Sequence, residues 1–91
     1  MHTVNYHRRA LKSLKQIPAA RATQILNAID HLASLADPAS DANVKKMHGP
    51  FEGSFRTRIG DYRVIFEIRK TGEPVVYVLL VTHNGARGSS Y

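Results

Sequence analysis

The segment from Ser54 to Arg69, SFRTRIGDYRVIFEIR, constrains the fold of this chain more than any other part of the sequence. Apolar and polar residues alternate on both sides of Gly60-Asp61, and a period of two is typical of β-strands. Gly60 and Asp61 suit a two-residue type II′ turn, which favours glycine at its first position. The segment is therefore predicted to form a β-hairpin in which Arg58 lies directly opposite Arg63.

The two faces of this predicted hairpin differ in character. The first is suited to a core and carries Phe55, Thr57, Ile59, Tyr62, Val64 and Phe66. The second carries Arg56, Arg58 and Arg63. Because like charges opposite each other destabilise an antiparallel pair, the arginines indicate an anion-binding surface, and a polyanion with closely spaced phosphates is the natural ligand. The alternative interpretation is a solvated sheet face on a basic protein.

The overall charge supports an acidic partner. Thirteen Lys and Arg against seven Asp and Glu give a net charge of +6, which favours nucleic acid first, an acidic protein second and an anionic membrane third. The 91 residues are expected to form one domain, 1–91. The sequence has no cysteine, so disulfides and thiolate chemistry are excluded.

Neither a targeting segment nor a membrane span is predicted. The residues after Met1, HTVNYHRRA, lack the apolar stretch of a secretory signal. The longest apolar run, Val75–Val81, is too short to cross a bilayer. A soluble cytoplasmic protein without a membrane partner is therefore expected.

The remaining elements follow from periodicity and chain breakers. Two amphipathic helices are predicted at Arg8–Ile17 and Ala19–Ala36, joined through Pro18. Short strands are expected within Met1–Tyr6 and at Val44–Met47. The run Val75–Val81 is apolar throughout and is expected to be a central strand buried on both faces.

The order β-α-α-β-β-β indicates an α+β fold, with a helical hairpin packed on one face of a mostly antiparallel, roughly four-stranded sheet. The apolar hairpin face is expected to pack against one side of the two helices. The helix residues assigned to this contact are Leu11, Leu14, Ile25, Ile29 and Leu32.

Neither metal binding nor a cofactor is predicted. The five histidines never pair at a spacing of three or four residues, and no carboxylate completes a ligand set. No glycine-rich phosphate loop and no nucleophile elbow are present. Paired-carboxylate catalysis has no support, because the acidic residues are scattered over the second helix, loops and turns.

The residues that remain suit RNA cleavage without a metal. Such cleavage needs a base for the 2′-hydroxyl proton, cations for the pentacovalent phosphate and an acid for the leaving oxygen. Lys45, Lys46 and His48 enter the sheet region that carries the arginines, and the tail is expected to bring His83, Arg87 and Tyr91 within reach of it. His48 and His83 are candidate acids or bases. Each has a structural alternative: His48 as a turn residue, His83 as a strand end and Tyr91 as a frayed terminus.

A longer segment around the predicted hairpin resembles a known protein family. The segment Val44 to Ile68, VKKMHGPFEGSFRTRIGDYRVIFEI, is similar to the core signature of the RelE/ParE superfamily of toxins from bacterial toxin–antitoxin modules. The hallmark there is K-L-x-G, a few residues, then L-Y-R-x-R-x-G-D-Y-R-V-I-Y. The predicted helical hairpin and the strand Val75–Val81 extend the resemblance over nearly the whole chain.

The resemblance to the RelE-type branch implies metal-independent cleavage of mRNA in the ribosomal A site. It assigns Arg56 and Arg58 to RNA orientation and proton transfer, and Arg63 to the transition-state phosphate. Arg87 and Tyr91 are the nearest equivalents of a further arginine and tyrosine in the tail. The resemblance also implies an antitoxin partner with an acidic or amphipathic segment, besides mRNA and the ribosome.

The tail departs from the family pattern. Asn84 stands where an arginine is usual in a G-H-R-R-D-x-Y-like ending, and Arg87 follows three residues later. This departure leaves a second hypothesis open, the ParE-type branch, which has the same fold but poisons DNA gyrase and cleaves no RNA.

Overall fold

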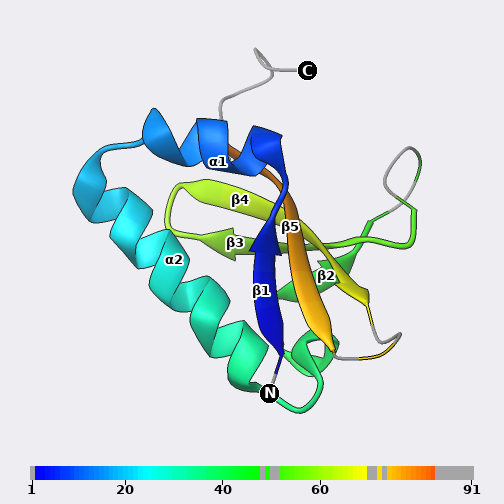
Figure 1. Ribbon diagram of the computed structural model, residues 1–91. Helices are drawn as coiled ribbons and strands as arrows, with labels where there is room; N and C mark the ends of the chain where they lie inside the picture. The colour runs from blue at the N-terminus through cyan, green and yellow to red at the C-terminus, as the bar shows by residue number, and fades with distance from the viewer. Residues whose placement is uncertain (1, 48, 50–51, 70–71, 73, 84–91) are drawn as a thin grey trace.

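The β-hairpin forms with the register that the sequence predicts. In the computed structural model, β3 (Phe55–Ile59) pairs antiparallel with β4 (Tyr62–Arg69), and Arg58 is the partner of Arg63. Gly60 has a φ of 58°, in the left-handed region that glycine adopts without strain. The structure describes residues 2–47, 49, 52–69, 72 and 74–83 (Figure 1).

The sheet has five strands, one more than expected. Its order is β1-β5-β4-β3-β2, in which β1 (Thr3–Tyr6) is parallel to β5 (Val75–His83) and the other pairs are antiparallel. The short strand β2 (Val44–Lys46) forms the opposite edge. The α+β class and the order β-α-α-β-β-β are confirmed. The strand count differs because both short segments join the sheet as edges.

Two helices cover one face of this sheet (Figure 1). α1 (Arg8–Lys15) begins after His7, whose Nδ1 accepts a hydrogen bond of 3.0 Å from the backbone NH of Arg9. α2 (Ala19–Ser34) begins after Pro18. α1 ends before the predicted Ile17, because a proline disfavours helical geometry in the residue before it. The short 3₁₀-helix η1 (Pro38–Ser40) follows α2, and none of the described helices is long and apolar enough to span a membrane.

The core lies between the helices and the sheet. Its fully buried side chains include Phe66 and Val64 from β4, Val78 from β5, and Ile25 and Ile29 from α2. The predicted apolar face of the hairpin is therefore confirmed as the core face.

Two details of the predicted core are wrong. Leu11 is 46% exposed, because α1 turns Ala10 and Leu14 toward the core instead. β5 is not buried on both faces: Val76, Val78 and Val81 are buried, but Leu79 is only half-buried. The helices cover only one face of the sheet. A β-bulge also interrupts the register, which passes from Leu80 to Val78 against consecutive residues of β4.

Phe66 provides the first test of this core. Its side chain is 1% exposed and its ring lies 5.9 Å from that of Phe55, so Phe66→Ala should lower the free energy of unfolding by roughly 3–5 kcal/mol. Leu11→Ala is the matched control and should cost less than about 1 kcal/mol, because this side chain is exposed. Urea denaturation followed by circular dichroism measures both. Equal losses for the two variants would contradict the assignment of the faces.

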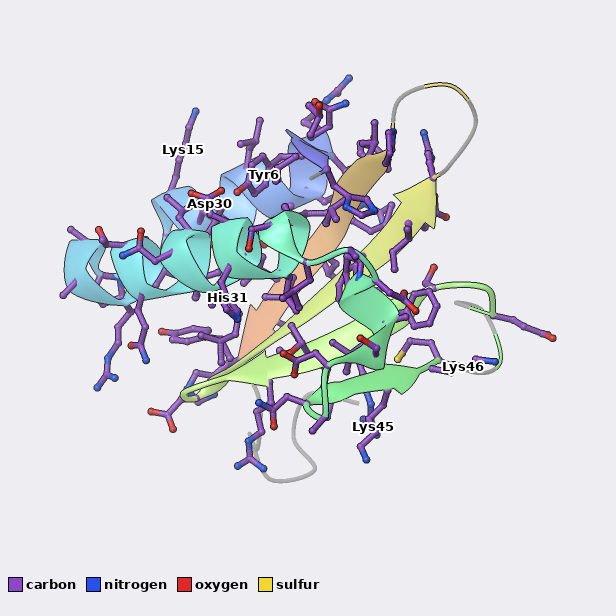
Figure 2. All side chains as sticks on the ribbon, turned by 90° about the horizontal axis from the view of Figure 1, so that it is seen from below. Tyr6, Lys15, Asp30, His31, Lys45 and Lys46 are labelled. Carbon is purple, nitrogen blue, oxygen red and sulfur yellow. The ribbon has the colours of Figure 1, made fainter. Side chains whose placement is uncertain are left out.

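The Tyr6 hydroxyl makes the stability of the fold depend on pH in the alkaline range. Tyr6 lies on β1 and packs against the core, and Figure 2 shows it near Asp30 on the helix side of the sheet. Burial, and secondarily the negative charge of Asp30, raise the pKa of Tyr6 above its ordinary value of 10.0. The folded state therefore holds this proton more tightly than the unfolded chain does.

This stabilising contribution is complete below pH 10.0 and is lost as the pH rises through the pKa of the folded state. Tyr6→Phe removes the titrating group and keeps the ring. We expect the variant to lose less stability than the parent as the pH rises above 10.0, as measured by urea midpoints. Parallel losses in both proteins would show that Tyr6 does not contribute.

Candidate functional site

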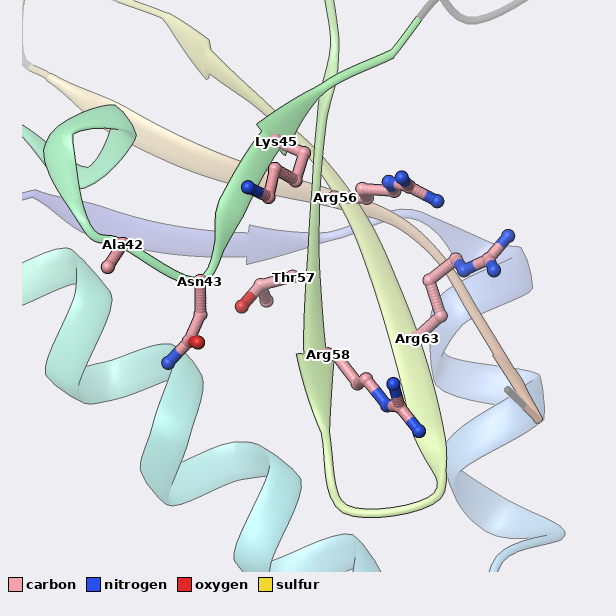
Figure 3. A pocket seen from close by; sticks show the side chains of 7 residues that line it. All are labelled: Ala42, Asn43, Lys45, Arg56, Thr57, Arg58 and Arg63. Atoms are coloured by element: carbon pink, nitrogen blue, oxygen red, sulfur yellow. The ribbon is translucent and has the colours of Figure 1, made fainter. Parts of the chain in front are cut away.

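A pocket lined by positive charge lies on the side of the hairpin that carries the arginines (Figure 3). It has a volume of about 400 Å³, and four of its seven lining residues are cationic and none is acidic. The lining residues are Ala42, Asn43, Lys45, Arg56, Thr57, Arg58 and Arg63. We call this the cationic pocket.

Strand register brings these cations together. Lys45 of β2 is the partner of Arg56 of β3, and Arg58 of β3 is the partner of Arg63 of β4. Paired residues project to the same face of a sheet and alternate residues share a face, so all four cations project away from the helices. Ile65, the partner of Arg56 on β4, is buried at 4% exposure and gives this face an apolar centre.

Among the described residues, no carboxylate neutralises the positive charge of Arg56 or Arg58. Glu67 could have paired with Arg58, but its Oε1 accepts hydrogen bonds from Arg69 at 2.9 and 3.1 Å instead. Arg69 also lies 4.3 Å from the centre of the Tyr77 ring. The one acidic residue that shares this face of β4 is therefore already engaged.

The structure separates two other predicted site residues from the cationic pocket. Lys46 follows Lys45 on β2, so it projects to the opposite face, where it lines a different cavity with Phe55 (Figure 2). His83 pairs with Tyr62, and the two rings meet edge to face at 5.2 Å. Tyr62 packs against the core, so His83 lies on the helix side of the sheet. RNA-binding and catalytic roles for Lys46 and His83 stay predictions, without a place in this pocket.

Three further candidates, His48, Arg87 and Tyr91, lie outside the described residues, as does Asn84. Their assigned roles stay predictions. Among the residues that the structure describes, no three of His, Asp or Glu are grouped so that they could hold a metal ion.

Sequence reasoning missed one polar residue of the pocket. Asn43 lies directly before β2 and lines the cationic pocket, and its backbone NH donates a 2.8 Å hydrogen bond to Oδ1 of Asp41. An Asp two residues before an Asn at a strand entry is a usual Asx-turn pattern, which could have indicated an ordered loop here. The approach of this loop to β3 depends on tertiary packing.

The α+β sandwich thus has one sheet face covered by helices and one uncovered face that carries a cluster of cationic side chains. Residues 4–87 match the family described as the ParE toxin of the type II toxin–antitoxin system parDE. The chain belongs to this family of toxins. None of the curated proteins matches the chain.

Solved structures of toxins have the same fold. The archaeal RelE–RelB complex from Pyrococcus horikoshii aligns with 28% identity and a TM-score of 0.73, covering 93% of this chain and 97% of that chain. The toxin–antitoxin complex RelBE2 from Mycobacterium tuberculosis aligns with 25% identity and a TM-score of 0.64, covering 91% and 98%. A mutant of Escherichia coli RelE in the free state has 19% identity and a TM-score of 0.72, covering 94% and 86%. The predicted membership of the RelE/ParE superfamily is confirmed.

The opposed arginines predict an unusual response to mutation. Arg58→Gln removes one member of a like-charged cross-strand pair, so the melting temperature should stay equal or rise slightly. Differential scanning calorimetry measures the change. A clear fall in melting temperature would show that Arg58 stabilises the fold and would weaken the case that it is held in place for a ligand.

Proposed function

We propose that this toxin is an endoribonuclease that cleaves mRNA in the ribosomal A site without a metal ion. The observation that carries the proposal is the cationic pocket, in which Arg56, Arg58 and Arg63 converge on the uncovered face of the sheet. Guanidinium groups bind phosphate through paired hydrogen bonds, and two of these arginines lie at opposed positions on adjacent strands. The pocket therefore suits a single phosphate between two cations.

The proposed chemistry is an internal transesterification. The 2′-oxygen attacks the adjacent phosphorus and loses its proton, the bond from phosphorus to the 5′-oxygen breaks, and that oxygen gains a proton. The products are a 2′,3′-cyclic phosphate and a 5′-hydroxyl. Arginines aimed at the phosphate stabilise the extra negative charge of the pentacovalent transition state.

The arginines cannot supply the base that this reaction needs. A guanidinium does not lose its proton in proteins, so Arg56 and Arg58 can orient RNA and stabilise charge but cannot act as the base. Within the cationic pocket, Lys45 is the only side chain that can exchange a proton. Proton transfer by His48 or Tyr91 remains part of the proposal, and both residues lie outside the described part of the chain.

The proposed partners follow from the same charge. The solved relatives include complexes of RelE with RelB and of RelBE2, each a toxin with its antitoxin. We expect an antitoxin with an acidic or amphipathic segment that masks the cationic pocket. The proposed place of action is the cytoplasm, where translating ribosomes provide the mRNA.

A second candidate function is inhibition of DNA gyrase without nucleolytic activity. The observation that favours it is the family match, because the matching family is named for the ParE toxin of parDE. On this reading the scaffold binds a protein, and the arginines contribute to that interface.

Primer extension on a translated message tests the proposal. The parent should produce new 5′ ends within codons, and Arg58→Gln should lower the cleavage rate by about 10²-fold or more, the usual scale for one preorganised charge-stabilising group. Arg21→Gln is the matched control, because Arg21 is an exposed arginine of α2 outside the cationic pocket. The double variant of Arg58 and Arg63 should lose less than the sum of the single effects, because both groups act on one phosphate.

The two candidate functions give opposite results in paired assays. Absence of cleavage by the parent, together with inhibition of gyrase supercoiling by the parent, would overturn the ribonuclease and establish the alternative. Cleavage at the parent rate by Arg58→Gln would overturn the role of Arg58 in the reaction. Cleavage that depends on Arg58, with supercoiling unaffected, would establish the ribonuclease.

A further inference from the structure

A second pocket adjoins the cationic pocket at the edge of the sheet. It has a volume of about 250 Å³ and shares Asn43, Thr57 and Arg58 with the cationic pocket. β2 pairs with β3 only as far as Thr57, so the end of β3 beyond that residue lacks a strand neighbour on this side within the described chain. The pocket occupies the space between this strand end, the loop before β2 and the C-terminal half of α2. We call it the edge notch.

The edge notch differs from its neighbour in composition. Ala28 and Leu32 of α2 and Ile59 of β3 give it an apolar lining, and His31, Asp41 and Asn43 add polar groups. Figure 2 shows His31 projecting from α2 toward the sheet, and Figure 3 shows the Asn43 side chain beside Thr57, with the Arg58 side chain directed from β3 toward β4. An apolar lining with an imidazole and an amide beside it has the chemistry of a site for a planar heteroaromatic group.

We propose that the edge notch binds a base of the RNA whose phosphate is held by the cationic pocket, an inference that rests on the proposed function. Arg58 lines both pockets, so one nucleotide can place its phosphate on the guanidinium and its base in the notch. Unpaired bases of single-stranded RNA are recognised by stacking on aromatic side chains, histidine included, and by hydrogen bonds to their edges. His31 provides the stacking surface, and Asn43 provides the amide.

The polar groups also define a preference among the bases. An asparagine amide pairs with the N6 and N7 edge of adenine, and an ionised carboxylate accepts hydrogen bonds only. Asp41 already accepts the Asn43 backbone NH through Oδ1, which fixes the loop that carries both side chains. A base with an exocyclic amino group offers two N–H donors to these acceptors, whereas uracil offers one N3–H donor between two carbonyl oxygens, so we expect the amino base to fit the notch better.

Binding of mononucleotides to the isolated protein tests the notch without the ribosome. We expect AMP to bind at least about fivefold more tightly than inorganic phosphate, because this factor is the lower bound for stacking one base on an aromatic side chain. AMP should also bind more tightly than UMP. AMP should shift the imidazole NMR signals of His31, assigned with His31→Gln, whereas phosphate should leave them in place. Equal affinities for AMP and phosphate would overturn the proposal.

Three variants separate base binding from phosphate binding. His31→Ala and Asn43→Ala should abolish the advantage of AMP over phosphate, and Arg58→Gln should weaken both ligands. Asn27→Ala is the matched control for Asn43→Ala, because Asn27 is an exposed residue of α2 that lines neither pocket. An AMP advantage that survives in His31→Ala and Asn43→Ala would overturn the assignment of these residues.

Cleavage mapping distinguishes this inference from the proposed function. In primer extension, His31→Ala and Asn43→Ala should redistribute cleavage among codons, whereas Arg58→Gln should lower it at all of them. An unchanged codon pattern in both notch variants would overturn the notch as a specificity site and leave the ribonuclease intact. Selective AMP binding by a parent protein that cleaves no message would support the notch and overturn the ribonuclease.

Discussion

The antiparallel pairing of β3 with β4 is the interaction on which the rest of this structure depends. Because side chains alternate between faces, a shift of one residue in this register would exchange Phe66 and Val64 with the arginines. Gly60 sets the register, since its positive φ allows the tight reversal between the strands. Burial of the apolar face under α2 and α1 then makes the register energetically decisive. Because side chains alternate, the residues between the core positions of these strands form the cationic face.

This arrangement explains how a chain of 91 residues tolerates concentrated charge. The core cluster consists of aliphatic and aromatic side chains between one helical layer and one sheet. The opposite face of the sheet carries Lys45, Arg56, Arg58 and Arg63, whose mutual repulsion is reduced by solvent and salt. Natural proteins commonly place locally unfavourable features at functional sites, and an opposed arginine pair is such a feature.

The edge of the sheet adds a second element to the site. β2 is short and leaves the last part of β3 without a strand neighbour on that side, so the loop before β2 and the helix α2 approach the strand end. Arg58 is positioned where the uncovered face meets this edge and lines both pockets. Under the two proposals, this single side chain connects the phosphate site with the base site.

The hairpin, its register and the separation of its core face from its arginine face can all be predicted from the amino-acid sequence. These depend on local alternation and on one glycine, and such short-range signals are encoded within a few residues. The arginine residues of the site were identified on the same basis, since the strand period alone places Arg56, Arg58 and Arg63 together.

Tertiary packing determines which residues from distant segments join or leave this face. It placed Lys45 in the pocket and Lys46 on the other side, turned His83 toward Tyr62, and selected Ala10 rather than Leu11 for the core. It also brought His31 of α2 beside Asn43 and Arg58. These positions depend on how short strands, a β-bulge and the rotated helices pack against a shared core. No single segment of the sequence specifies that packing.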